Sequence, residues 1–147
     1  MSGAGHGPVR ALGIDLGSKR IGIAVSDRSG TIASPLLVLQ RSGSRKQDHR
    51  RIAELVVEEE AEVVVVGLPL SMSGRIGPAA KGALTETAEL ATVVGVPVES
   101  FDERLTTVTA DKAMMEAHMR AEARRRIVDK IAAAVMLQNW LDSRPRT

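Results

Sequence analysis

The 147-residue sequence contains no cysteine and no tyrosine, one phenylalanine and one tryptophan. Without cysteine there is neither a disulfide framework nor a thiolate metal site. The scarcity of aromatic rings argues against base stacking as the main binding mode, so a nucleic-acid partner would be held by its backbone. Residues 1–10 lack the apolar core of a signal peptide, and no apolar run approaches the roughly 18 residues of a membrane span. We therefore expect a cytoplasmic protein with no membrane contact.

The composition is otherwise that of an ordinary globular chain, with 44% hydrophobic and 26% charged residues. A chain of this length is expected to form one domain with a sizeable core. The formal net charge is only +2. Such a small excess does not by itself indicate a polyanionic partner, so the distribution of the basic residues is more informative.

The hydrophobic pattern predicts three strands followed by alternating helices and strands. Strands are expected at 9–15, 20–27, 31–40, 63–66 and 96–101, and helices at 44–60, 78–95, 106–119 and 123–142. Pro35 within the third strand indicates an edge strand or a bulge. This order predicts an α/β domain with a mixed sheet and helices on both faces. Residues 1–8 and 143–147 are expected to be flexible termini.

Asp15 ends the first strand, where another apolar residue would be usual. The two strands of the first hairpin have bulky residues on one face and small ones on the other. Asp15 belongs to the small face, with Ala11, Gly13, Gly22 and Ala24. Something is therefore expected to pack or bind very close to that face, with Asp15 at its end. The alternative is a turn aspartate that caps the hairpin corner.

Two further groups of acids are out of place. Asp102 and Glu103, followed by Arg104, lie between a strand end and the next helix, where α/β sheets gather ligands. A solvated charged loop is the alternative. Asp129 heads an apolar ridge of the last predicted helix, which is costly unless the carboxylate is paired. A salt bridge to Arg125 or Arg126 is the alternative there.

Together, three such carboxylates have the chemistry of a divalent cation site. Hard cations such as Mg²⁺ prefer oxygen ligands and keep several waters, so two or three carboxylates suffice. Two ions roughly 4 Å apart activate water and stabilise the leaving oxygen of a phosphodiester. The three histidines are scattered, and neither a Walker-type phosphate loop nor a Gly-x-Ser-x-Gly elbow is present.

Four segments follow one another in order between Leu12 and Asp142: GIDLGSKRIGIAVSD, VVVGLPLSMSGRIGPAA, DERLTTVTA and VDKIAAAVMLQNWLD. Taken together, they resemble the YqgF/RuvX family, described as pre-16S rRNA nucleases and as Holliday-junction resolvases. The first segment alone is less specific, because sugar kinases and actin-like ATPases carry a similar Asp-x-Gly loop. The resemblance implies an RNase H-like fold, with a five-stranded mixed sheet and helices on both sides, for a single nuclease domain at 9–142.

The resemblance also implies a catalytic, metal-binding triad of Asp15, Glu103 and Asp129, with Mg²⁺ or Mn²⁺, and two ions expected. The small face beside Asp15 would let the final helix bring Asp129 close. One departure concerns the loop after GLPL, where the family often has Asn-x-Asp-Gly and this chain has Ser71-Met72-Ser73-Gly74. That loop therefore lacks an amide and a carboxylate.

Basic residues surround the proposed acids and would hold the phosphates of pre-rRNA or branched DNA without reading bases. They are Lys19, Arg20, Arg104, Arg124, Arg125, Arg126 and Lys130. The basic run of the first predicted helix, Arg45 to Arg51, is interpreted as a solvent face, with an extension of the nucleic-acid binding track as the alternative. Symmetric cleavage of a four-way junction would require a homodimer.

The leading hypothesis is a metal-dependent nuclease, a hydrolase of structured RNA or DNA. Two other classes remain open. One is a nucleotide-binding regulator that uses GIDLGSKRIG as a phosphate loop, although the chain is short for the two domains that such ATPases close around nucleotide. The other is a nucleic-acid or ribosome-associated protein that keeps the fold without the chemistry.

Overall fold

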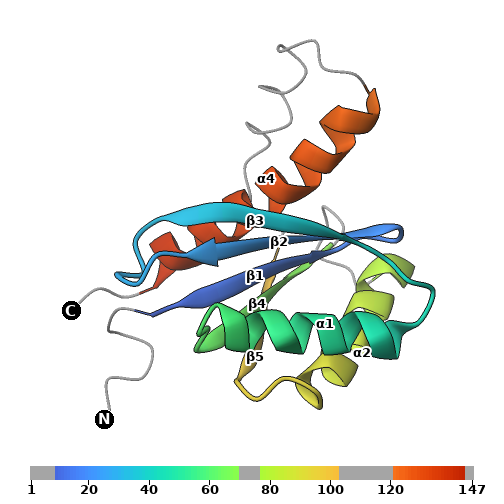
Figure 1. The fold of residues 1–147 in the computed structure, drawn as a ribbon, viewed down its shortest axis with the longest axis horizontal. Helices are drawn as coiled ribbons and strands as arrows, with labels where there is room; N and C mark the ends of the chain where they lie inside the picture. The colour runs from blue at the N-terminus through green and yellow to red at the C-terminus, as the bar shows by residue number, and fades with distance from the viewer. Residues whose placement is uncertain (1–8, 70–76, 103–120, 145–147) are drawn as a thin grey trace.

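The computed structural model describes residues 9–69, 77–102 and 121–144, and for 121–130 it describes the backbone alone. A five-stranded sheet lies at the centre, with helices on both of its faces (Figure 1). The structure confirms the α/β class and the mixed sheet predicted from the sequence. Within the described residues, no helix is long and apolar enough to cross a membrane.

The sheet combines an antiparallel and a parallel half. Its strands are β1 (Ala11–Leu16), β2 (Arg20–Ser26), β3 (Ala33–Gln40), β4 (Val63–Leu68) and β5 (Val98–Asp102). They lie in the order β3-β2-β1-β4-β5. The pairs β1–β2 and β2–β3 are antiparallel, whereas β1–β4 and β4–β5 are parallel. The carboxyl ends of β1, β4 and β5 therefore share one edge of the sheet.

The irregularity expected at Pro35 is present. β3 is an edge strand, and its register with β2 shifts between Ile23 and Ala24, the latter opposite Pro35. An edge position and a broken register both suit a residue that has no backbone N–H to donate.

Helices α1 (Arg45–Glu58) and α2 (Pro78–Ala91) cover the bulky face of the sheet (Figure 1). Ser44 caps α1 by accepting a hydrogen bond from the Gln47 amide at 3.2 Å. Pro78 begins α2, where its missing N–H is not needed. The side chains that join these helices to the strands include Leu12, Ile14, Ile23, Ile52, Leu55, Val66 and Leu90.

Helix α4 (Ala121–Ser143) covers the small face and contacts β1, β2, β3 and β4. Its Met136, Leu137 and Trp140 are buried against small or β-branched residues of the strands, among them Ala11, Ala24, Val63 and Val65. The expectation that something packs very close to the small face is confirmed, and α4 is what packs there.

One predicted boundary is wrong. The helix expected to end at Gly95 ends at Ala91, with Thr92 as its C-cap. The chain then turns, and the Val94 amide donates to the Leu90 carbonyl at 3.1 Å. This turn still buries the Val94 side chain in the core. Val94 therefore continues the apolar spacing of α2, although it lies beyond the end of the helix. The helix expected over 106–119 and the Ser71–Gly74 loop lie outside the described residues.

Candidate active site

Asp15 is the one member of the predicted triad whose side chain the structure describes. It lies in β1, pairs with Gly22 of β2 and is half-buried. Successive strand residues point to opposite faces, so Asp15 shares the α4 side with Ala11 and Gly13. The residues beside it on this face are small, which lets α4 pack close to β1.

The chain turns sharply after Asp15. The Gly17 amide donates to the Asp15 carbonyl at 3.1 Å, and a Cβ atom on Gly17 would lie 2.4 Å from the Arg20 carbonyl oxygen. Only glycine fits such a close backbone approach. The hairpin corner, which we define as Leu16–Lys19, is therefore a compact turn that directly follows the proposed metal ligand.

Asp102 ends β5 at the same edge of the sheet but on the opposite face. Its neighbour Phe101 packs with the α4-side cluster, and Val98 packs with the α1–α2 side. Strand alternation places Asp102 on the side of Val98. Asp102 and Asp15 therefore point to opposite faces. The predicted ligand Glu103 lies outside the described residues.

Asp129 lies in α4, one helical turn before Ala133. Its backbone belongs to the described helix, and its side chain is outside the described part of the structure. From Ala133 onward one face of the helix is buried against the sheet. The structure therefore brings the helix that carries Asp129 onto the face that carries Asp15, and the meeting of the two carboxylates stays a prediction.

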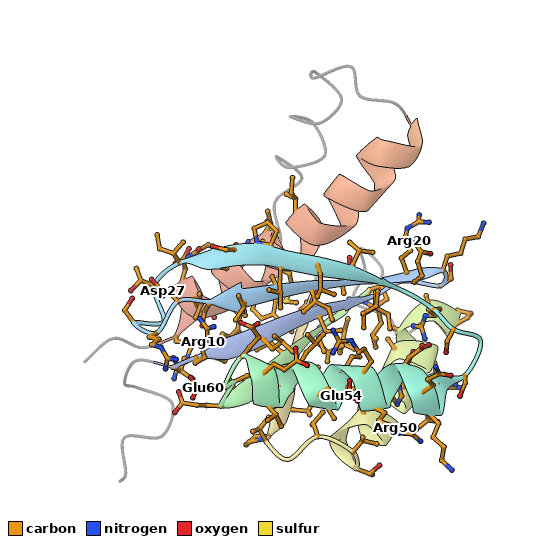
Figure 2. All side chains as sticks on the ribbon, in the orientation of Figure 1. Arg10, Arg20, Asp27, Arg50, Glu54 and Glu60 are labelled. Atoms are coloured by element: carbon orange, nitrogen blue, oxygen red, sulfur yellow. The ribbon has the colours of Figure 1, made fainter. Side chains whose placement is uncertain are left out.

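Two of the predicted phosphate-binding residues are described, and both lie at the β1–β2 end of the sheet. Lys19 is exposed and Arg20 is half-exposed. Figure 2 shows Arg20 at the hairpin end, remote from Arg10 and Asp27 at the opposite end. The other predicted contacts, Arg104, Arg124, Arg125, Arg126 and Lys130, have no described side chains.

A cavity of about 400 Å³ adjoins the hairpin corner, lined by Ser18, Lys19, Arg41, Gly43, Arg45 and Asp48. It brings the corner together with the first residues of α1. Asp48 within it is buried and accepts hydrogen bonds from the Ser42 amide and hydroxyl at 3.1 and 2.8 Å. Both hydrogen bonds go to Oδ1, so this oxygen is held by the loop that precedes α1.

The interpretation of the first helix as a plain solvent face is wrong at His49. This side chain is 3% exposed, and its Nε2 lies 2.8 Å from Oε2 of the buried Glu86. His49 precedes Ile52 by three residues, so it lies on the apolar stripe of α1. That spacing was a usable signal for its burial. The partner Glu86 lies between Ala83 and Leu90 on the apolar stripe of α2, so the same kind of spacing was a signal for its burial.

The chemistry of Asp15 suits a hard divalent cation, because carboxylate oxygens are the ligands that Mg²⁺ and Mn²⁺ prefer. Among the described residues, no group of three His, Cys, Asp or Glu side chains could hold a metal ion. Further donors of these types would therefore come from outside the described side chains, and the predicted partners Glu103 and Asp129 lie there.

Comparisons with known proteins agree with these features. The sequence profile of the RuvX family, described as Holliday junction resolvase, matches residues 9–143. A protein of Mycobacterium sp. (strain KMS), named "Putative pre-16S rRNA nuclease", is 46% identical over 136 residues, covering 92% of this chain and 80% of the relative. A Listeria innocua protein of the same name is 42% identical, with 92% and 99% covered.

Among solved structures, RuvC of T. thermophilus in complex with a Holliday junction substrate aligns with a TM-score of 0.58 and 18% identity. The alignment covers 93% of this chain and 98% of that one. A second T. thermophilus RuvC structure aligns with a TM-score of 0.52 and the same identity. At this identity the likeness concerns the fold alone, and it confirms the expected RNase H-like architecture.

Proposed function

The chain belongs to the RuvX family, and on that premise we propose that it is a metal-dependent nuclease that processes the 5′ end of pre-16S rRNA. The reaction is hydrolysis of phosphodiester bonds in a structured nucleic acid. Relatives named for this activity match over nine-tenths of the chain. Processing of rRNA would place the protein in the cytoplasm.

The observation that carries the proposal is the position of Asp15. A half-buried carboxylate lies next to the last residue of β1, at the edge where three parallel strands terminate, on the face covered by α4. Ligands of parallel α/β sheets bind at such carboxyl ends. A turn aspartate that only capped the corner would need neither the small face beside it nor the helix that lies across that face.

Asp15, Glu103 and Asp129 are the residues that would hold Mg²⁺ or Mn²⁺, two ions in the arrangement the family implies. Bound there, the metal would supply Lewis-acid stabilisation of the phosphate and a more acidic water. At the hairpin corner, Lys19 and Arg20 would neutralise phosphates of the bound nucleic acid. The basic residues around Glu103 and Asp129 would do the same. Such contacts orient the backbone without reading the sequence.

The test compares wild type, Asp15→Asn and Asp142→Asn on an RNA that carries the pre-16S 5′ leader, with Mg²⁺ or Mn²⁺ and with chelator. Asp142 is an exposed carboxylate on α4 that accepts from Gln138 Nε2 at 3.1 Å, so it controls for loss of a charge. We expect metal-dependent cleavage by wild type and Asp142→Asn, and none by Asp15→Asn. Equal cleavage by Asp15→Asn would contradict the proposed site.

A four-way DNA junction is the second substrate in the same assay, because the matching family profile is described as a Holliday junction resolvase. Metal-dependent cleavage of the junction, with the RNA intact, would replace the rRNA substrate by branched DNA. Paired symmetric cuts would further require two sites in a homodimer, which sedimentation would detect. Binding of either substrate without cleavage would indicate a non-catalytic member.

A further inference from the structure

Arg41 directly follows β3 and forms hydrogen bonds to the hairpin corner of β1 and β2. Its Nε donates to the Gly17 carbonyl at 2.7 Å, and its backbone amide donates to the Lys19 carbonyl at 3.0 Å. The Gly17 amide in turn donates to the Asp15 carbonyl at 3.1 Å. Arg41 therefore hydrogen-bonds to the backbone of two of the four residues that follow Asp15.

The two terminal nitrogens of Arg41 are held by a side chain of α2. Its two terminal nitrogens donate to the two carboxylate oxygens of Glu86 at 2.9 and 3.0 Å. Oε2 of Glu86 also lies 2.8 Å from His49 Nε2 on α1. The three side chains are 18%, 8% and 3% exposed. The guanidinium is thus held in one orientation by both helices that cover this face.

Only an arginine satisfies these contacts together. The planar fork pairs with both oxygens of Glu86 while Nε remains available for the Gly17 carbonyl. A lysine ammonium is a point donor and cannot make all three hydrogen bonds at once. Arg41→Lys would therefore keep the charge and the backbone hydrogen bond to Lys19, but lose the side-chain contacts that join Gly17 to Glu86.

We propose that Arg41 is a positioning residue for metal binding, because through Gly17 it fixes the corner that follows Asp15. This inference rests on the proposed function, in which Asp15 is a metal ligand. Groups that orient metal ligands typically change metal affinity or activity by about 10- to 100-fold when they are lost. Arg41 acts through backbone atoms two residues from the ligand, so about tenfold is expected.

Arg10 provides a matched control at the other end of β1. It donates through Nε to the Glu59 carbonyl and through a terminal nitrogen to the Glu59 carboxylate, both at 2.9 Å. It also donates to the Ser26 carbonyl. Its side chain is 20% exposed, against 18% for Arg41. Arg10→Lys therefore disturbs a similar network that does not reach the hairpin corner.

The experiment measures Mn²⁺ affinity by calorimetric titration for wild type, Arg41→Lys, Arg10→Lys and Asp15→Asn. Hydrogen exchange of the peptide that contains Gly17, Ser18 and Lys19 is followed in the same samples. We expect Arg41→Lys to weaken Mn²⁺ binding about tenfold and to speed exchange at the corner. Arg10→Lys should leave both unchanged, and Asp15→Asn should abolish binding.

The outcomes separate the two proposals. If wild type binds Mn²⁺, Asp15→Asn does not, and Arg41→Lys matches Arg10→Lys in both measurements, the positioning role is overturned and the metal site stands. If Arg41→Lys binds tenfold more weakly but its corner exchanges like wild type, the effect does not pass through the corner and the inference also fails. If wild type binds no Mn²⁺, the proposed function fails first and the inference fails with it.

Discussion

Gly13 and Leu137 are in such close contact that no side chain fits between them. A Cβ atom built on Gly13 would lie 2.8 Å from Leu137 Cβ and 3.3 Å from its Cγ. Leu137 is fully buried, so it cannot move aside into solvent. This contact sets how closely α4, which carries Asp129, approaches β1, which carries Asp15.

Gly13→Ala is therefore expected to destabilise the fold by about 1–3 kcal/mol, the usual cost of overpacking a core. Urea unfolding followed by the fluorescence of Trp140, the single tryptophan, measures this directly because that side chain is buried on α4. Gly82→Ala is the control. Gly82 is exposed within α2 with open space around it, so the same change should stabilise by about 0.5–1 kcal/mol. Two losses of equal size would contradict the close-contact argument.

A close approach to the small face could be predicted from the sequence, because strand alternation places Ala11, Gly13 and Ala24 on one face of the hairpin. The family resemblance then implied that the final helix makes this approach. Its partner could not be read in the same way. Leu137 looks like any other apolar residue of an amphipathic helix until the helix is placed. Local periodicity therefore predicted the surface, and the tertiary structure supplied the residue that fills it.

The network of Arg41, His49 and Glu86 could not be predicted, since it joins residues 37 and 45 positions apart. Helix spacing places His49 on the apolar stripe, but nothing in the sequence pairs it with a carboxylate on another helix. The family resemblance named Asp15, Glu103 and Asp129. The network that holds the Asp15 corner emerges only from the three-dimensional arrangement.

Divalent ions should stabilise the wild-type protein and leave Asp15→Asn unaffected. A ligand that binds only the folded state adds about 1.4 kcal/mol at a free concentration ten times its dissociation constant. Thermal unfolding with and without Mg²⁺ measures this without any nucleic acid. Asp142→Asn serves again as the control and should respond like wild type. An equal response in Asp15→Asn would place the ion elsewhere.

Lys19→Gln should weaken nucleic-acid binding and flatten its salt dependence. Lys19 is exposed at the hairpin corner, and each phosphate contact contributes about one unit to the slope of log affinity against log salt. Filter binding at several salt concentrations gives that slope. Lys81→Gln removes an exposed lysine of α2 and should leave it unchanged. Equal slopes for wild type, Lys19→Gln and Lys81→Gln would show that Lys19 makes no phosphate contact.

Glu86 should make stability sensitive to acid. Burial opposes ionisation of this carboxyl, but hydrogen bonds from Arg41 and His49 outweigh it and hold its pKa below the ordinary 4.5. A carboxyl whose pKa is lowered by folding stabilises the protein above its unfolded pKa. That contribution is lost as the pH falls below 4.5 and passes through the lowered value, because the proton then binds the unfolded chain more readily.

The free-energy difference between wild type and Glu86→Gln should therefore be largest near neutral pH and shrink as the pH falls below 4.5. Urea unfolding across that range measures it. Glu54→Gln is the control, because Glu54 is 56% exposed and pairs with Arg51 at 3.3 Å on the surface of α1. Such surface pairs contribute about 0–1 kcal/mol, so its difference from wild type should stay small throughout. A Glu86→Gln difference that does not change with pH would mean that the carboxylate charge contributes nothing to holding Arg41.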